Sequence, residues 1–229
     1  GTVHRTDAPR DAVSDHRNDP AFTEIGHALV DALAPQLAHL AATRERLVVG
    51  VAGESGSGKS TTAMALAEAL QARGVTAGLV HQDNYFVRPP RTNHEFRLQD
   101  LGAVGPHEVD MARIAQHITA FRAGASSVDA PVVNYPENRF DQVTRDFAPL
   151  QVLIVEGTYV LMLDDLDVRV FLEATHEDTH ERRMARNRDI YEPIIDTILG
   201  IEHRLIAPQG ATADWLIDRA FRIRRGHGA

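Results

Sequence analysis

The chain has 229 residues, of which 43% are apolar and 24% charged, with a net charge of −8 and no cysteine. This composition is typical of a globular protein with a large core, and the lack of cysteine excludes disulfides, iron–sulfur clusters and thiolate zinc sites. The negative charge argues against a broad nucleic-acid-binding surface. No long apolar run or secretory signal pattern is seen, so we expect a cytoplasmic protein without a membrane partner.

Two segments precede the main pattern. Residues 1–20 are polar and poor in large apolar side chains, which predicts a flexible leader. We expect one domain over residues 21–229. It begins with apolar side chains at helical spacing in residues 21–45, which predict an amphipathic helix that Pro35 kinks or divides.

From residue 47 onward, short apolar runs alternate with helical patterns, which predicts a mainly parallel, doubly wound sheet flanked by helices. Strands are expected over 47–53, 76–83, 152–157, 168–174 and 214–218. Helices are expected directly after the first strand and over 108–123, 177–188 and 192–204. Residues 84–106 and 124–150 are rich in proline and are expected to be loops. In such sheets, loops at the carboxyl ends of strands supply the active site.

The first strand runs into the stretch GVAGESGSGKSTT, which contains Lys59, the only lysine in the chain. Its residues 53–60 match G-x-x-x-x-G-K-[ST], the phosphate-binding P-loop, between a predicted strand and a predicted helix. Backbone N–H groups would surround the phosphates, Lys59 would reach the β- and γ-phosphates, and Ser60 would bind Mg²⁺. The expected nucleotide-binding residues are Gly53, Glu54, Ser55, Gly56, Ser57, Gly58, Lys59, Ser60 and Thr61. A chance Gly/Ser loop is the alternative.

Two carboxylates follow strands predicted beside this loop. Glu156 ends the apolar run VLIVE, where it would hold Mg²⁺ directly or through water. Asp83 ends the second strand, where it would take or orient the proton of an attacking hydroxyl and lie near the metal. The alternatives are a surface glutamate at a strand end and an Asx turn that closes the strand.

An arginine-rich stretch, HERRMARNRDI, suggests a lid over residues 180–195. Arg183 and Arg186, with Arg182 and Arg188, could neutralise the charge on the phosphoryl group during transfer. A solvated basic helix paired with nearby acidic residues is the alternative.

These pieces together resemble a known family. The stretches GVAGESGSGKSTT, HQDNYF and VEGTYVL, followed by the Arg-rich segment and LIAPQGATADWLID, resemble the uridine kinase and phosphoribulokinase-like branch of P-loop kinases. The resemblance implies a P-loop NTPase fold, ATP and Mg²⁺ as cofactors, and phosphoryl transfer to a hydroxyl group. It also implies that Asp83 is the base and that Glu156 lies beside the metal.

The acceptor side departs from the uridine kinase pattern. Val104 stands where a sugar-binding acid is expected, and Asn134 replaces a second acid. These differences argue against uridine itself as the acceptor. Candidate acceptor contacts are Tyr85, His107, Tyr135 and Arg139, with His81 as a further candidate; ordinary loop residues are the alternative.

The leading hypothesis is therefore an ATP-dependent kinase acting on a small nucleoside or sugar-like molecule. The alternatives are a nucleotide-dependent switch or chaperone-like NTPase and a catalytically silent binding module. A guanine-binding switch is excluded because its usual Asn-Lys-x-Asp motif needs a second lysine. The sequence leaves open whether the protein forms a homo-oligomer.

Overall fold

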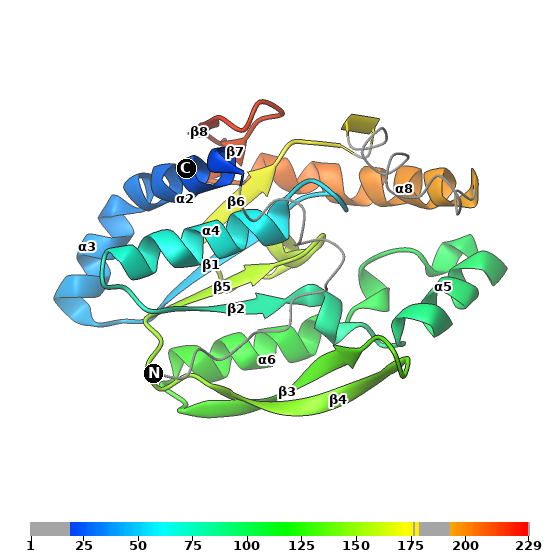
Figure 1. Ribbon diagram of the computed structural model, residues 1–229, viewed down its shortest axis with the longest axis horizontal. Helices are drawn as coiled ribbons and strands as arrows, with labels where there is room; N and C mark the ends of the chain where they lie inside the picture. The colour runs from blue at the N-terminus through cyan, green and yellow to red at the C-terminus, as the bar shows by residue number, and fades with distance from the viewer. Residues whose placement is uncertain (1–18, 176, 179–192, 229) are drawn as a thin grey trace.

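The computed structural model describes residues 19–175, 177–178 and 193–228. A six-stranded sheet with the order β2-β5-β1-β6-β7-β8 forms its centre (Figure 1). Every neighbouring pair is parallel except β7 and β8, as the alternating pattern predicts. The strands are β1 (Leu47–Ala52), β2 (Ala77–His81), β5 (Val152–Glu156), β6 (Val168–Leu172), β7 (Trp215–Ile217) and β8 (Ile223–Arg225).

Helices cover both faces of this sheet, so the central strands are mostly apolar. Helices α2 (Pro20–Ala32), α3 (Ala34–Thr43) and α4 (Lys59–Ala72) contribute to the apolar cluster on one face. Helices α6 (Met111–Arg122) and α8 (Pro193–Ile206) contribute to the cluster on the other. Strand β1 supplies Val49 and Val51 to the first cluster and Val48 to the second, and all six of its residues are buried.

The N-terminal helix is divided, as predicted. The break falls at Leu33, and Pro35 lies in the first turn of α3, where a proline costs no backbone hydrogen bond. Helix α6 starts three residues later than expected because the Asp110 side chain caps it by accepting from the Arg113 N–H. None of the helices in the described part of the chain has the length and apolar character that a membrane crossing requires.

The two segments expected to be loops are mostly regular, so that prediction was wrong. Residues Pro90–Gln99 form helix α5, which has proline at its first position but almost no apolar face to signal it. Strands β3 (Ser127–Asn134) and β4 (Arg139–Asp146) form an antiparallel hairpin. Pro131 is tolerated because a two-stranded hairpin has free edges, and the turn uses Asn138 in the left-handed conformation with φ 47°.

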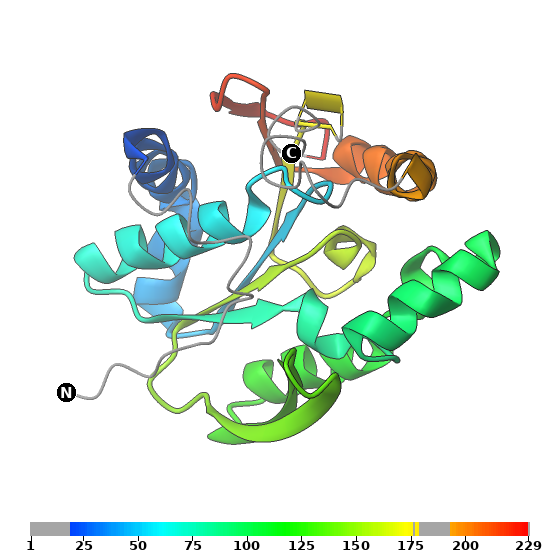
Figure 2. The ribbon, with the colours of Figure 1, turned by 45° about the vertical axis from the view of Figure 1, so that its right-hand side comes forward.

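The predicted leader lies almost entirely outside the described residues, as do the lid candidates Arg182, Arg183, Arg186 and Arg188 and most of the helix expected over 177–188. In Figure 2, α5 and α8 both extend beyond the same edge of the sheet. This edge is where strands β1, β2 and β5 end.

Candidate active site

Three predicted site elements meet at the carboxyl edge of the sheet. Strand β5 lies between β1 and β2, and its last residue, Glu156, is in register with Val51 and His81. The phosphate loop therefore leaves β1 beside Glu156, while Asp83 follows β2 on the other side within the short 3-10 helix Gln82–Tyr85. The phosphate loop, Asp83 and Glu156 therefore meet at one edge of the sheet, as the parallel strand order predicts.

The phosphate loop has the backbone that its glycines allow. Gly56 and Gly58 have φ values of 79° and 93°, which residues with a Cβ rarely adopt, and Gly58 is the N-cap of helix α4. Lys59 is the first residue of that helix, and its Nζ lies 3.4 Å from the Glu54 carbonyl oxygen within the same loop. The helix N-terminus and the one lysine thus combine at one anion-binding turn.

Glu156 is held as an anion within the protein. Its side chain is 2% exposed, and its Oε1 lies 2.7 Å from Nδ1 of the buried His81. Burial alone would raise the pKa of Glu156, but the His81 hydrogen bond and charge, the Lys59 charge and the Ser60 hydroxyl together lower it. The candidate substrate contact His81 therefore faces Glu156.

Asp83 has the opposite electrostatic environment. Desolvation and the neighbouring Glu156 carboxylate raise the pKa of Asp83, against the attraction of Lys59. Since Asp83 is exposed to solvent, we attribute its raised pKa mainly to the neighbouring Glu156 carboxylate. The site thus holds two carboxylates whose proton affinities are shifted in opposite directions.

The donor set at this edge fits Mg²⁺. It contains a hydroxyl oxygen from Ser60 and carboxylate oxygens from Glu156 and Asp83, the hard ligands that this ion prefers. Across residues 19–175, 177–178 and 193–228, no three His, Asp or Glu side chains form a complete metal cage. Magnesium usually takes only one or two carboxylates and completes its shell with phosphates and water, so the arrangement suits Mg²⁺ bound with a nucleotide.

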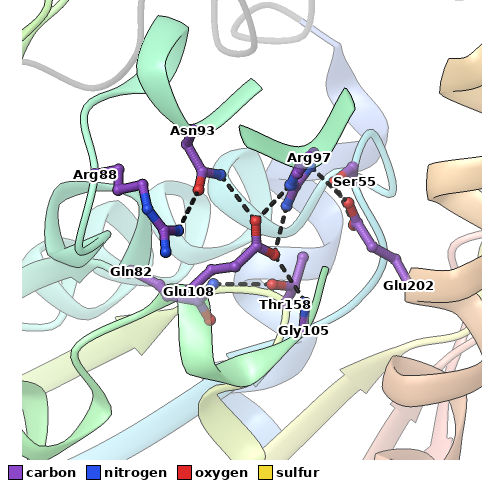
Figure 3. Close-up of polar contacts among 9 residues, drawn as sticks. All are labelled: Ser55, Gln82, Arg88, Asn93, Arg97, Gly105, Glu108, Thr158 and Glu202. Atoms are coloured by element: carbon purple, nitrogen blue, oxygen red, sulfur yellow. Dashed lines mark hydrogen bonds and ion pairs between the residues drawn. The ribbon is translucent and has the colours of Figure 1, made fainter. Parts of the chain in front are cut away.

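A buried ionic network, which the sequence analysis missed, lies next to the phosphate loop (Figure 3). Arg97 of α5 donates to Glu108 through Nε at 2.5 Å and through Nη2 at 2.8 Å, and to Glu202 of α8 at 3.3 Å. Ser55 of the phosphate loop lies 3.4 Å from the other Glu202 oxygen. No spacing rule in the sequence connects these four residues, because they come from four separate segments.

The charges in this network depend on Arg97. Burial would raise the pKa of Glu108, but hydrogen bonds from Arg97, from the Gly105 N–H and from Asn93 lower it. Burial also raises the pKa of Glu202, against the attraction of Arg97 and Lys59. Two buried carboxylates therefore share one guanidinium, and the second is only partly compensated.

Helix α8 also contacts the phosphate loop through its next residue. His203 Nδ1 lies 3.0 Å from a carboxylate oxygen of Glu54. Together with the Ser55–Glu202 contact, this fixes α8 against the loop at two successive loop residues.

A small pocket of about 200 Å³ opens beside Asp83. It is lined by Asp83, Phe86, Arg88, Pro90, Asn93, His94, Arg97 and Tyr135. Of the four predicted acceptor contacts, only Tyr135 is in this lining.

The other three predicted contacts lie elsewhere. Tyr85 is buried, and its hydroxyl lies 2.7 Å from Nδ1 of His117 on α6, away from the pocket lining. Arg139 pairs with Asp141 at 2.9 Å on the exposed hairpin. His107, in the short 3-10 helix Pro106–Glu108, is also absent from the pocket lining.

Comparison with known proteins assigns the chain to a family. The model of the Phosphoribulokinase / Uridine kinase family matches residues 48–221. The chain is 30% identical over 189 residues to a bifunctional alpha-galactosidase/sucrose kinase of Mediterraneibacter gnavus, covering 76% of this chain but only 20% of that protein. It is 29% identical to a uridine kinase of Shewanella amazonensis, covering 80% of this chain and 92% of the enzyme.

A solved structure agrees with this assignment at the level of fold. The phosphoribulokinase of Rhodobacter spheroides superposes with a TM-score of 0.57 at 14% identity, covering 77% of this chain and 71% of that chain. The residues that the family model matches include the phosphate loop, Asp83, Glu156 and all the residues that line the pocket. The chain therefore belongs to the phosphoribulokinase / uridine kinase family of P-loop kinases.

Proposed function

We propose that this protein is an ATP-dependent kinase that transfers the γ-phosphoryl group to a hydroxyl of a small sugar-like or nucleoside-like molecule. The observation that carries this proposal is the position of Asp83. Asp83 lines the 200 Å³ pocket, and its carboxylate is also close enough to Glu156 and to Lys59 of the phosphate loop to interact electrostatically with both. A base placed between donor phosphate and acceptor hydroxyl is what phosphoryl transfer requires.

Each of these residues at the carboxyl edge of the sheet has a role in the proposed reaction. Residues 53–61 bind the phosphates of ATP, and Lys59 lies along the β- and γ-phosphates. Asp83 takes or orients the proton of the acceptor hydroxyl, whose oxygen bonds to the γ-phosphorus as the bond to the ADP oxygen breaks. Ser60 and Glu156, with Asp83 nearby, would hold Mg²⁺, which neutralises phosphate charge when bound.

The surroundings of the two carboxylates support these roles. His81 holds Glu156 in its ionised form, and the raised pKa of Asp83 makes it a better proton acceptor than an ordinary aspartate. The lid arginines Arg183 and Arg186, which lie outside the described residues, stay a prediction. They would close over the transferred group and exclude water.

The relatives support the acceptor class. Sucrose and uridine, the acceptors in the relatives' names, both carry sugar hydroxyl groups. We also propose one domain over residues 21–229, ATP as the donor, a cytoplasmic location and no nucleic-acid partner. The competing proposal is an NTPase switch that hydrolyses ATP without a small-molecule acceptor.

An acceptor panel distinguishes the two proposals. The protein is mixed with Mg²⁺ and ATP, and ADP release is followed with each of a set of sugars, sugar phosphates, hydroxy acids and nucleosides. A kinase releases ADP well above the acceptor-free background with at least one member, and mass spectrometry then finds that member phosphorylated. ADP release that no acceptor raises above background would instead favour the switch.

A further inference from the structure

The pocket beside Asp83 has an unusual charge composition for a site that binds a neutral sugar or nucleoside. Its lining includes two arginines, Arg88 and Arg97, against one carboxylate, that of Asp83. Neutral hydroxyl compounds need few formal charges around them. Which of these charges is available to a ligand depends on how each is already paired.

Arg97 is already neutralised by the protein. It makes two hydrogen bonds to Glu108 and one to Glu202, and both acids are buried. Although burial lowers the pKa of Arg97, these carboxylates raise it. With two anions around one cation, Arg97 has no positive charge to offer an additional anion.

Arg88 is placed differently. Within residues 19–175, 177–178 and 193–228, it makes no ion pair with a carboxylate; its hydrogen bond goes to the amide oxygen of Asn93, at 3.4 Å from Nη1. The guanidinium carbon lies 3.7 Å from the centre of the Phe96 ring, so a cation–π contact holds the group in place. Neither contact neutralises the charge, and among the described residues most of the five guanidinium donors have no partner.

Asn93 separates this charge from the nearest acid. Figure 3 shows Asn93 between Arg88 and Glu108. Its Nδ2 donates to Glu108 at 2.9 Å, which turns its oxygen toward Arg88. Asn93 is buried, so this orientation is fixed, and the neutral amide takes the place at which an acid would have paired with Arg88.

We propose that the acceptor carries an anionic group, a carboxylate or a phosphate, and that Arg88 binds this group while the acceptor hydroxyl lies at Asp83. A held guanidinium with free donors matches the two oxygens of such a group and can bind them bidentately. The inference rests on the proposed kinase function for the hydroxyl end. It makes Arg88 the residue that selects charged acceptors over neutral ones.

Matched pairs of compounds test this selection. Glycerate is compared with glycerol, and ribose 5-phosphate with ribose, so that each pair differs in the anionic group, and the two pairs separate carboxylate from phosphate. kcat/KM is measured for the wild type, Arg88→Gln and Arg88→Lys. The control is Arg91→Gln, because Arg91 lies three residues away and outside the pocket lining.

We expect the wild type to prefer at least one anionic compound over its neutral counterpart. Arg88→Gln should reduce kcat/KM for that compound by roughly 10- to 100-fold, mainly through KM, since a hydrogen bond to a charged group contributes about that factor. Arg88→Lys should recover part of the loss, whereas Arg91→Gln should change little. Equal turnover of charged and neutral partners, or an anion preference that survives Arg88→Gln, overturns the inference but leaves the kinase proposal intact.

Binding measurements keep the inference testable if no compound is phosphorylated. With Mg²⁺ and a non-hydrolysable ATP analogue filling the phosphate loop, calorimetry measures binding of the same four compounds to the wild type and to Arg88→Gln. Arg88-dependent binding of an anion without turnover would support the anion site and contradict the kinase proposal. If neither anion binds more tightly than its neutral counterpart, the inference is wrong.

Discussion

The phosphate loop and the pocket that Asp83 lines, the proposed acceptor site, are built in different ways. The loop is one continuous stretch, residues 53–61, whose function depends on backbone shape, a helix N-terminus and one lysine. The pocket is assembled from α5, the turn of the β3–β4 hairpin and the segment between β2 and α5, and its side chains are held by the Arg97–Glu108 network. The donor site is therefore determined locally, whereas the acceptor site depends on tertiary contacts.

This difference suggests how one fold can serve several acceptors. Strands β1 and β5, which lead to the phosphate loop and to Glu156, are buried on both faces and offer little freedom for change. Helix α5 and the hairpin lie outside the central sheet, where substitutions alter the pocket without disturbing the core. Specificity would then reside in residues such as Arg88 and Asn93.

The largest expected effect is on the donor side. Replacing Lys59 with Met removes the lysine proposed to bind the ATP phosphates, so we expect kcat to fall roughly 10³-fold, the upper range for losing one transition-state donor. ATP should also cease to raise the melting temperature. The control is Arg73→Gln, an exposed change at the far end of the same helix. Wild-type turnover by Lys59→Met would remove the loop from the mechanism.

On the acceptor side, the largest effect should be on stability. Arg97→Met leaves Glu108 and Glu202 buried without their shared cation, which we expect to cost about 3–5 kcal/mol of unfolding free energy. Urea unfolding measures it, with Arg122→Met as the control, because its partners Asp165 and Asp167 are more exposed. If Arg97→Met lowers the unfolding free energy less than Arg122→Met does, the Arg97 network does not stabilise the pocket.

A smaller effect should appear in the pH dependence of stability. Because the folded-state pKa of Glu108 lies below its ordinary value of 4.5, its contribution is present above that value and is lost as the pH falls through the folded-state pKa. The stability difference between wild type and Glu108→Gln should therefore shrink as the pH is lowered past 4.5. Unfolding curves at several pH values measure this, and a difference that stays constant or grows would contradict it.

The smallest effect should come from the exposed hairpin. Arg139 pairs with Asp141, and the Arg139 side chain is 60% exposed. Exposed ion pairs contribute less than about 1 kcal/mol. Arg139→Gln should therefore leave both stability and acceptor turnover nearly unchanged, in contrast to Arg88→Gln. A large loss of turnover would show that Arg139 contacts the acceptor and that the acceptor site extends beyond the pocket lining.

The sequence predicted the structure around the phosphate loop well because its signals are local. A buried strand, a Gly-rich loop and an Ala-rich helix follow one another directly, and the parallel order of β1, β2 and β5 brings Glu156 and Asp83 to the same edge. The division of the first helix at Leu33 followed from Pro35 in the same way.

The acceptor side was harder to predict because its signals are not periodic. Helix α5 is polar on nearly all sides, and β3 contains a proline, so both were expected to be loops. Tyr85 resembled a pocket residue, but the short 3-10 helix after β2 turns it toward His117 in the core. The pairing of Arg97 with Glu108 and Glu202 joins residues 11 and 105 positions apart, which no sequence spacing reveals.

The central claim is that Asp83 takes or orients the proton of an acceptor hydroxyl next to the phosphate loop. One variant tests this claim most directly. Asp83→Asn is compared with the wild type and with Asp164→Asn, an exposed carboxylate between β5 and β6. ATP affinity and acceptor-dependent ADP release are measured on the same samples. We predict nearly unchanged ATP binding with acceptor-dependent turnover reduced roughly 100-fold or more, as expected for loss of a general base. Turnover equal to that of the wild type would contradict the account.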